Sequence, residues 1–230
     1  MNPEQCTEKL REIYGSDLQS VILYGSSAGE DVHRYSDFNL LVVLNDISFS
    51  SIGKSAKFCQ KWMRKNPAPL FVSPQHLETS RDVFPIEFYD MKERHRVLYG
   101  TDPLVEMQIR PDFLRLQCES ELKGKLIALR SEWIRLYPSR RRGKKLMLLS
   151  SSSFLAIFRG LLRLLGETVP PTKREVLIKL TEKTRLDISI FNRILDWLEG
   201  SKKLSRSEVL PMMEEYLTTL ERVASFVDKL

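Results

Sequence analysis

Apolar residues are arranged in two different ways along the chain, and the arrangement changes near residue 110. In the first part, short apolar runs are separated by turn residues, as in strands that are joined by helices and loops. From about Asp112 onward, apolar residues recur with the 3.6-residue period of amphipathic helices. Strands followed by helices predict an α+β fold, with a mixed sheet and helices over residues 1–110 and an all-α helical bundle over residues 111–230.

Signals at the start of the chain predict one helix and two strands. Asn2 is a favourable N-cap and Pro3 suits the first helical position, so a helix is predicted from there to about Tyr14. The run SVILYG predicts a strand that ends on Gly25. The run DFNLLVVL predicts a second strand, and its four consecutive apolar residues place that strand at the centre of the sheet.

The rest of the first half predicts a helix near residues 50–64, a strand at APLFV and a short helix that opens with SPQHLE. In the segment VFPIEFYDM that follows, apolar and other side chains alternate along the sequence. Phe84, Ile86 and Phe88 point to one side of an extended chain, and Glu87 points to the other. This alternation predicts a further strand that carries Glu87.

The second half predicts five helices, at about residues 112–136, 146–165, 173–180, 188–198 and 209–230. The last of them has an apolar face that includes the adjacent residues Met212 and Met213. We interpret this face as bundle core, and the seam of a homodimer is the alternative.

Composition narrows the class of protein. Of the 230 residues, 42% are apolar and 29% are charged, which excludes an intrinsically disordered chain. Three widely spaced cysteines without metal-ligand spacing indicate reduced thiols, so a cytoplasmic location is expected. The most apolar run is interrupted by Arg159 and Arg163 and is interpreted as a core helix, with no membrane partner. His33, His76 and His95 show no metal-ligand spacing and are interpreted as surface or capping residues.

Positive charge is concentrated in the second half. Residues 1–110 carry 13 Lys and Arg against 15 Asp and Glu, whereas residues 111–230 carry 23 against 15. The densest cluster is SRRRGKK, from Ser139 to Lys145. It is interpreted as a solvated loop between helices, with contact to a phosphate backbone as the alternative. No aromatic residue is interleaved with it in the sequence, so base stacking is not predicted.

One stretch, LYGSSAGEDVHRYSDFNLLVVL, combines features of a phosphate site and a metal site. Gly25 allows a tight turn whose N–H groups point outward, and Ser26 adds a hydroxyl donor, which together suit an anion. Asp37 and Asn39 are two residues apart and therefore share one face of a strand. Mg²⁺ takes oxygen ligands from one or two carboxylates and from substrate phosphates. Glu87 is predicted to supply a further carboxylate from a neighbouring strand.

This combination resembles the nucleotidyltransferase superfamily that includes DNA polymerase beta. The layout of the whole chain is similar to the kanamycin nucleotidyltransferase group and its small prokaryotic relatives. The resemblance implies that Gly25 and Ser26 hold the β and γ phosphates of a nucleoside triphosphate and that Asp37 bridges Mg²⁺ ions. It also implies that Glu87 helps to activate an acceptor hydroxyl, with Asp90 as the alternative.

The chain departs from the family pattern at the second acid, where it has Asn39. An asparagine carbonyl can ligate Mg²⁺, but one full negative charge is missing. Removal of one well-placed electrostatic contribution commonly lowers a rate by ~10²–10³. In one reading, a neighbour such as Glu30 or Asp31 restores the charge, or weak catalysis suffices. In the other, the fold keeps its nucleotide pocket and has lost the reaction. His33, in the loop before Asp37, is a candidate substrate contact.

The resemblance therefore implies a protein that binds a Mg²⁺–nucleoside triphosphate and transfers a nucleoside monophosphate to a hydroxyl acceptor, either a small molecule or a macromolecule. Two alternatives stay open. One is a catalytically inactive nucleotide-binding or toxin–antitoxin-type partner module, which Asn39 favours. The other is a nucleic-acid-binding protein that uses the basic helical half, which the run from Ser139 to Lys145 favours.

Overall fold

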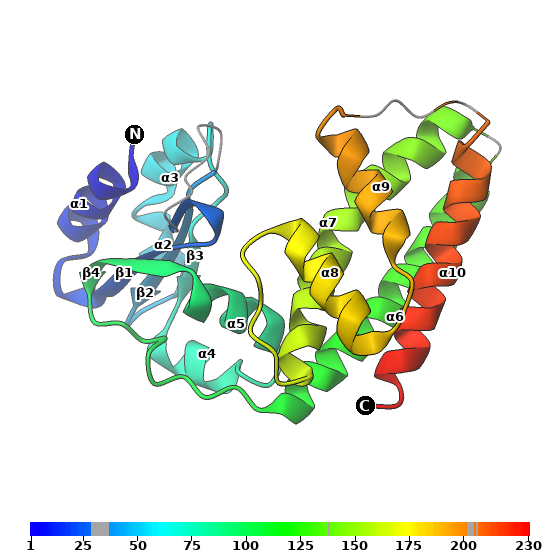
Figure 1. The fold of residues 1–230 in the computed structure, drawn as a ribbon. Helices are drawn as coiled ribbons and strands as arrows, with labels where there is room; N and C mark the ends of the chain where they lie inside the picture. Colours follow the sequence, from blue (N-terminus) through cyan, green and yellow to red (C-terminus); the bar gives the residue numbers. More distant parts are fainter. Residues whose placement is uncertain (29–36, 138, 202–204, 206) are drawn as a thin grey trace. The chain divides into compact units, whose positions relative to one another are not determined.

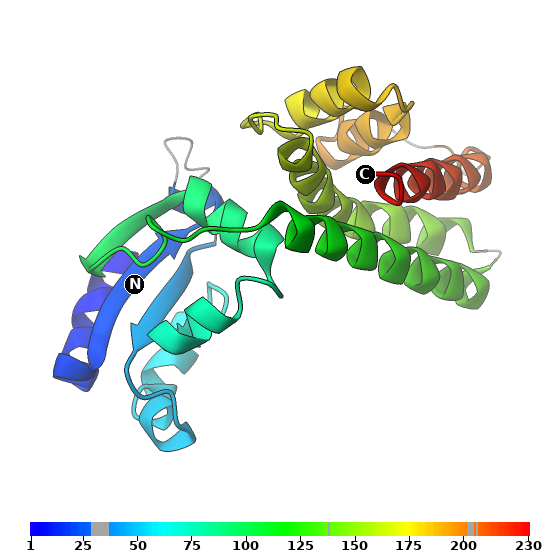
Figure 2. The same ribbon diagram turned by 90° about the horizontal axis from the view of Figure 1, so that it is seen from below.

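The computed structural model describes residues 1–28, 37–137, 139–201, 205 and 207–230. The chain divides into two compact units, Met1–Arg110 and Pro111–Leu230. The first unit contains the described strands together with short helices, and the second is helical (Figure 1 and Figure 2). The α+β class predicted from the two periodicities is confirmed.

The N-terminal unit opens as predicted, with helix α1 (Pro3–Tyr14) and strand β1 (Leu18–Tyr24). Asn2 caps α1 through a capping box with Gln5, in which each side chain accepts a hydrogen bond from the other residue's N–H. The remaining elements are the 3₁₀ helices η1 (Gly15–Asp17) and η2 (Ser26–Ala28), strand β2 (Asn39–Leu44), helices α2 (Phe49–Gly53) and α3 (Ala56–Trp62), strand β3 (Leu70–Val72), helices α4 (Pro74–Thr79) and α5 (Pro85–Glu93), and strand β4 (His95–Gly100).

Two predictions for this unit are corrected. The single helix expected near residues 50–64 is two helices, α2 and α3. The segment VFPIEFYDM forms no strand, because Pro85 occupies the first position of helix α5. Ile86, Phe88 and Met91 are buried by that helix. The strand that follows, β4, is not among the predicted elements.

The sheet has the strand order β3-β2-β1-β4. Strand β1 is antiparallel to β2 and to β4, and β3 is parallel to β2, so the sheet is mixed, as predicted. Strand β2 lies between two others, in agreement with its continuous apolar run.

Helices cover both faces of this sheet (Figure 2). On one face, α1 and α3 pack against β1 and β2 through Cys6, Leu10, Tyr14, Leu18, Val21, Leu23, Leu40, Val42, Leu44 and Trp62. On the other face, α4 and α5 pack through Ile22, Leu41, Val43, Val72, Leu77, Phe88, Met91, Leu104 and Met107. Odd-numbered residues of β2 thus face α4 and α5, and Asn39 continues this series.

The C-terminal unit consists of the five predicted helices. They are α6 (Pro111–Leu136), α7 (Arg140–Leu164), α8 (Lys173–Thr184), α9 (Ser189–Leu198) and α10 (Val209–Val227). The structure corrects the predicted start of one of these helices. Helix α7 begins at Arg140, so the basic run SRRRGKK forms its first turns and is not a loop.

Aromatic side chains form the centre of this unit. Phe154 and Phe158 of α7 meet Phe191 of α9 and Tyr216 of α10, and the closest pair of ring centroids, between Phe158 and Phe191, is 4.8 Å apart. The Tyr216 hydroxyl lies 2.9 Å from Ser150 Oγ, and burial raises the pKa of Tyr216. Met212 and Met213 are also buried within the unit, in agreement with their interpretation as bundle core.

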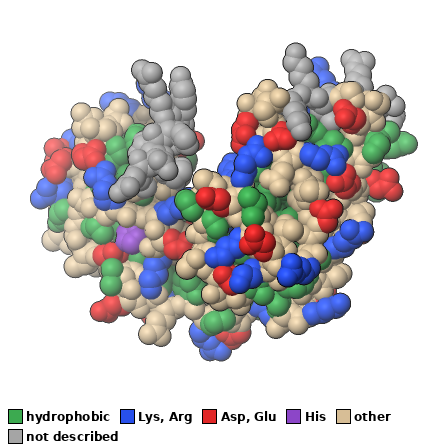
Figure 3. All heavy atoms as spheres, viewed as in Figure 1, with side chains coloured by type: hydrophobic (Ala, Val, Ile, Leu, Met, Phe, Trp, Pro, Cys, Tyr) green, Lys and Arg blue, Asp and Glu red, His purple; other side chains and the backbone are tan. Residues whose placement is uncertain are grey.

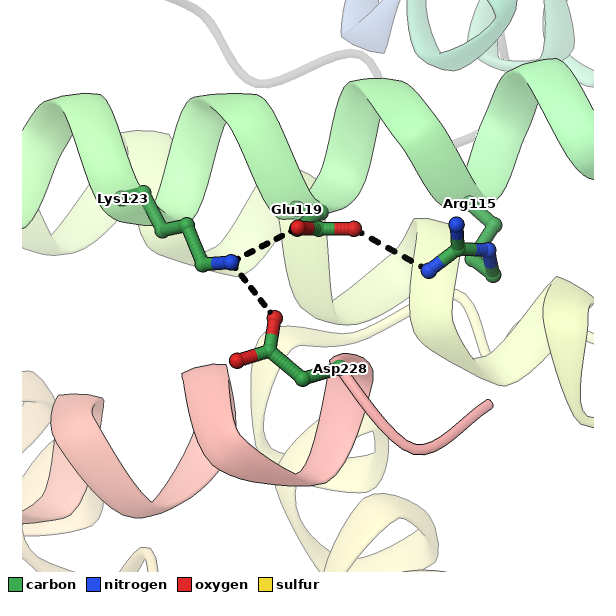
Figure 4. Close-up of polar contacts among 4 residues, drawn as sticks. All are labelled: Arg115, Glu119, Lys123 and Asp228. Carbon is green, nitrogen blue, oxygen red and sulfur yellow. Dashed lines mark hydrogen bonds and ion pairs between the residues drawn. The ribbon is translucent and has the colours of Figure 1, made fainter.

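Ion pairs on the surface join α6 to α10 (Figure 4). Lys123 Nζ lies 2.8 Å from Asp228 Oδ1 and 2.7 Å from Glu119 Oε1, and the other oxygen of Glu119 lies 3.0 Å from Arg115 Nη1. Exposed ion pairs typically contribute only about 0.2–1 kcal/mol each. Burial of the apolar core therefore contributes more to the stability of the unit than these ion pairs do.

Among the described helices, α7 is long and apolar enough over residues 141–164 to cross a membrane by length and composition, and half of that window is buried inside the protein. It packs against α6, α8, α9 and α10. Its buried residues include Phe154, Phe158, Leu161 and Leu162. These contacts are those of a core helix, as the sequence predicted.

The three cysteines, Cys6, Cys59 and Cys118, are free and buried. Burial, and in second place the nearby Cys59, raises the pKa of the Cys6 thiol to about 12. Burial also raises the pKa of Cys59, so the Cys6 and Cys59 thiols are protonated at neutral pH, and all three cysteines belong to the core.

Candidate functional site

The turn after β1 needs the glycine that the sequence provides. Gly25 has φ +83°, in the left-handed region where residues with a side chain are strained. Its N–H donates to the Arg94 carbonyl (2.9 Å), and its carbonyl accepts from the Ala28 N–H (3.0 Å). The turn is thus held between the end of α5 and the 3₁₀ helix η2. The N–H of Gly25 does not point outward as predicted, because the Arg94 carbonyl accepts its hydrogen bond. Ser26 begins η2, and its side chain lies outside the described atoms.

The register of the sheet brings Asn39 beside this turn. Tyr24, the last residue of β1, pairs with Asn39, the first residue of β2. A Cβ atom added to Gly25 would lie only 3.3 Å from Asn39 Nδ2. The structure therefore brings together two residues that the sequence assigned to the site, one to the phosphate turn and one to the metal ligands.

Asp37 lies two residues before β2 and is exposed. Its backbone carbonyl accepts a hydrogen bond from Ser27 Oγ at 2.6 Å, and Ser27 is buried. The next N–H, that of Phe38, donates to Asn66 Oδ1 at 3.1 Å. These two bonds fix the backbone around Asp37 against η2 and the end of α3. Sequence reasoning selected Ser26 and missed Ser27, because nothing in the spacing distinguishes the two adjacent serines.

Glu87 does not lie on a strand, which corrects the prediction. It is exposed in the first turn of α5. Six residues separate it from Glu93 at the other end of the helix, about 9 Å along the axis at ~1.5 Å per residue. The Gly25 N–H binds the carbonyl of Arg94, directly after that far end. Glu87 therefore lies on a helix and not on a strand beside Asp37, and Asp90 lies about one turn further along the same helix.

The described residues fit one Mg²⁺ ion and not a two-metal centre. None of the four described strands, LQSVILY, NLLVVL, LFV and HRVLYG, contains Asp or Glu. The same part of the chain holds no group of three or more His, Cys, Asp or Glu arranged for a metal ion. The Asp37 carboxylate and the Asn39 amide oxygen suit an ion that also takes ligands from nucleotide phosphates. Glu30, Asp31 and His33 lie outside the described residues.

The sequence predicted a surface or capping role for His95, and the structure places it at the edge of this site, partly buried and in contact with the end of α5. His95 begins β4 and pairs with Tyr24 on the side of β1 away from β2. Its Nε2 lies 2.8 Å from Asp102 Oδ2, and its Nδ1 lies 3.1 Å from the Lys92 carbonyl. Burial acts to raise the pKa of Asp102, but the hydrogen bonds from His95 and from the Leu104 N–H outweigh it and lower that pKa. The pair ties the start of β4 to the loop that follows it.

No family model and no curated protein matches the sequence. Among solved structures, the chain is similar to the spectinomycin adenyltransferase AAD(9) from Enterococcus faecialis, solved with ATP and spectinomycin. The identity is 15%, the alignment covers 96% of this chain and 100% of that chain, and the TM-score is 0.56.

Two toxin–antitoxin structures also match, a mutant of MntA–HpeT at 19% identity and a toxin–antitoxin with AMP-PNP at 18%. Each alignment covers 44% of this chain and 76% of the other chain, with a TM-score of 0.31, which is too low to support an argument about the fold. The likeness to the adenyltransferase extends over nearly the full length of both chains and concerns the fold alone. The chain shares the fold of this adenyltransferase, including a helical C-terminal part, in agreement with the resemblance in its sequence.

Proposed function

We propose that this chain binds a nucleoside triphosphate together with Mg²⁺ at the Gly25 turn and the head of β2. The triphosphate lies against the backbone of Gly25 and Ser26, and the Asp37 carboxylate and the Asn39 amide oxygen hold the ion. The proximity of Gly25 to Asn39, 3.3 Å from an added Cβ to Nδ2, carries the proposal, because it joins the phosphate turn to the metal position. The ATP in the structure of the similar adenyltransferase supports a nucleotide as the ligand.

Each residue of this site contributes binding or positioning. Mg²⁺, when bound, neutralises phosphate charge and orients the triphosphate. Asp37 supplies a full negative charge to the ion, and Asn39 supplies a neutral oxygen. Gly25 keeps the space beside Asn39 free of a side chain, so that the phosphates can approach the backbone. Ser27 holds the Asp37 backbone in place through its 2.6 Å hydrogen bond.

Transfer of a nucleoside monophosphate is slow at this site. In that reaction the acceptor oxygen attacks the α phosphorus, the bond to pyrophosphate breaks, and the acceptor proton passes to a base. Asn39 leaves the site one charge short, and the described strands offer no carboxylate as the base. Each missing electrostatic contribution lowers the rate by ~10²–10³. The chain is therefore a nucleotide-binding protein in which binding is retained and turnover is reduced.

Calorimetric titration with ATP and GTP, with and without Mg²⁺, tests the binding. We expect affinity in the micromolar range, dependent on Mg²⁺, and its loss in Asp37→Ala, because that variant removes the carboxylate that holds the ion. Asp82→Ala is the matched control, since Asp82 is an exposed aspartate in a turn of the same unit. Equal binding by both variants, or no binding of either nucleotide to folded wild-type protein, would contradict the proposal.

A further inference from the structure

The excess positive charge of this protein is confined to one short segment. Residues 130–145 contain seven Lys and Arg and one Glu, a net charge of +6. The whole chain also has a net charge of +6, so the remaining residues are neutral in sum. The segment comprises the end of α6 and the start of α7, which adjoin each other in the C-terminal unit.

The cations at the start of α7 differ from the others in their surroundings. Arg130 pairs with Glu221 at 2.6 Å, and Arg135 pairs with Glu132 at 2.6 Å. Arg141, Arg142 and Lys145 are exposed, and no residue in the described part of the chain forms an ion pair with them. Elsewhere on the helical unit, in the view of Figure 3, Lys and Arg side chains are interspersed with Asp and Glu.

The presence of these cations at the start of α7 is not explained by a stabilising effect on that helix. The N-terminus of a helix carries a partial positive charge, which disfavours cations in its first turn. Helix α7 has no acidic residue in that turn, and Ser139 makes no side-chain capping bond there. The cations of the first turns therefore act against the local helix, and an anionic partner would relieve the repulsion.

The fold adds aromatic rings that the sequence did not associate with this cluster. Trp133 and Tyr137 of α6 form an edge-to-face pair with centroids 5.7 Å apart, and the Tyr137 side chain is 63% exposed. Gly143 of α7 packs directly on this pair, since an added Cβ would lie 2.8 Å from Trp133 Cζ3. On α9, the ring of Trp197 lies 5.9 Å from Lys144 Nζ. Exposed cations and an exposed ring thus lie close along the chain, at the surface formed by the end of α6 and the start of α7.

We propose that this surface binds single-stranded nucleic acid. We name it the α6–α7 surface, and it is formed by Trp133, Tyr137, Arg141, Arg142, Lys144 and Lys145. The cations bind successive phosphates, and Tyr137 stacks on an unpaired base, which a duplex would keep inside its own stack. A lipid bilayer is a poorer fit, because the largest apolar residues of α7 beyond this end, among them Met147, Phe154 and Phe158, are buried in the bundle. The proposal does not depend on the nucleotide site of the N-terminal unit.

The electrostatic part is tested by fluorescence anisotropy with a labelled oligouridine of roughly 20 nucleotides over a range of salt concentrations. Arg141→Gln/Arg142→Gln removes two cations and keeps good helix formers at both positions. For single strands, the slope of log affinity against log salt should become shallower by about 1.4, and affinity at about 0.1 M salt should fall roughly 25-fold. Lys173→Gln/Lys229→Gln, at two other exposed positions of the unit, has the same net charge and should bind like the wild type.

The stacking part is tested with Tyr137. Tyr137→Ala should weaken binding roughly 5- to 150-fold, the range observed for loss of one stacked base, with an unchanged salt slope. Tyr137→Phe keeps the ring and should therefore bind like the wild type. This comparison distinguishes a loss of stacking in the alanine variant from a loss of folding.

Three results would overturn the proposal. The first is no binding of the oligouridine at low salt by folded protein. The second is an equal loss of affinity in the Lys173→Gln/Lys229→Gln control, which would indicate a diffuse effect of net charge. The third is binding to phosphatidylserine-containing vesicles without binding to the oligouridine, which would identify a membrane surface instead.

Discussion

At the scale of single residues, Gly25 is the position on which the candidate site depends most. It combines a positive φ with close packing against Asn39, a residue that we assign to the same site. A side chain there would strain the backbone and press on the amide that we assign to the metal ion. Both effects act on the turn that the phosphates occupy.

We predict that Gly25→Ala lowers the free energy of unfolding by about 1–2 kcal/mol, because it places a Cβ in the left-handed region. It should also weaken nucleotide binding. Gly53→Ala is the control, since an added Cβ at that position in α2 meets no atom within 4 Å. That substitution should be neutral or stabilising by up to ~1 kcal/mol. Chemical denaturation and nucleotide titration of both variants check this, and unchanged nucleotide affinity in Gly25→Ala would count against the phosphate turn.

Sequence reasoning identified Gly25, Asp37 and Asn39 because each is marked by a local signal, a turn residue or a spacing of two along a strand. The proximity of Gly25 and Asn39 could not be read from the sequence, since it depends on the register between β1 and β2. The hydrogen bond from Ser27 to the Asp37 backbone and the position of His95 depend on tertiary structure in the same way.

At the scale of elements, α5 shows how a short window can be misread. Phe84, Ile86 and Phe88 alternate as in a strand, yet Pro85, Phe88 and Met91 recur at helical spacing over the same few residues. Pro85 at the first helical position is the signal that decides between them. Strand β4 could have been found from the apolar run RVLYG, which is rich in strand-forming residues and ends on a glycine with positive φ.

The start of β4 is held by a titratable pair, and its effect on stability depends on pH. Folding lowers the pKa of Asp102, so the pair stabilises the fold above the unfolded value of about 3.9 and loses this effect as pH falls through the folded value. Asp102→Asn should therefore lower the free energy of unfolding by about 1–2 kcal/mol at neutral pH. The difference from wild type should vanish in strongly acidic solution. Denaturation curves at several pH values measure this.

The matched control for that prediction is Asp82→Asn, at an exposed aspartate of the same unit. Its stability should follow that of the wild type at every pH. A constant deficit of Asp102→Asn across the pH range would mean that the hydrogen bond with His95 does not account for its effect.

At the scale of the whole molecule, the helical half was predictable because its helices are long and keep one apolar face over many turns. The sheet of the first half was predictable in class but not in strand order, since its pairings join residues far apart in the chain. The net charge of the chain indicates a binding surface only when the charged residues are located in the structure. The +6 of the chain equals that of residues 130–145, and Trp133 of that segment meets the start of α7 only through the packing of α6 against α7.

The central claim is a retained Mg²⁺–nucleotide site from which one negative charge is missing at Asn39. It is tested most directly by calorimetry of Mg²⁺–ATP with wild type, Asn39→Asp and Asn45→Asp. Asn39 is the first residue of β2 and Asn45 directly follows its last residue, so both variants add the same charge at an end of the same strand. We predict Mg²⁺-dependent binding by wild type, tighter binding by Asn39→Asp alone, and no change in Asn45→Asp. No binding by any of the three folded proteins, or an equal gain in both variants, would contradict the account.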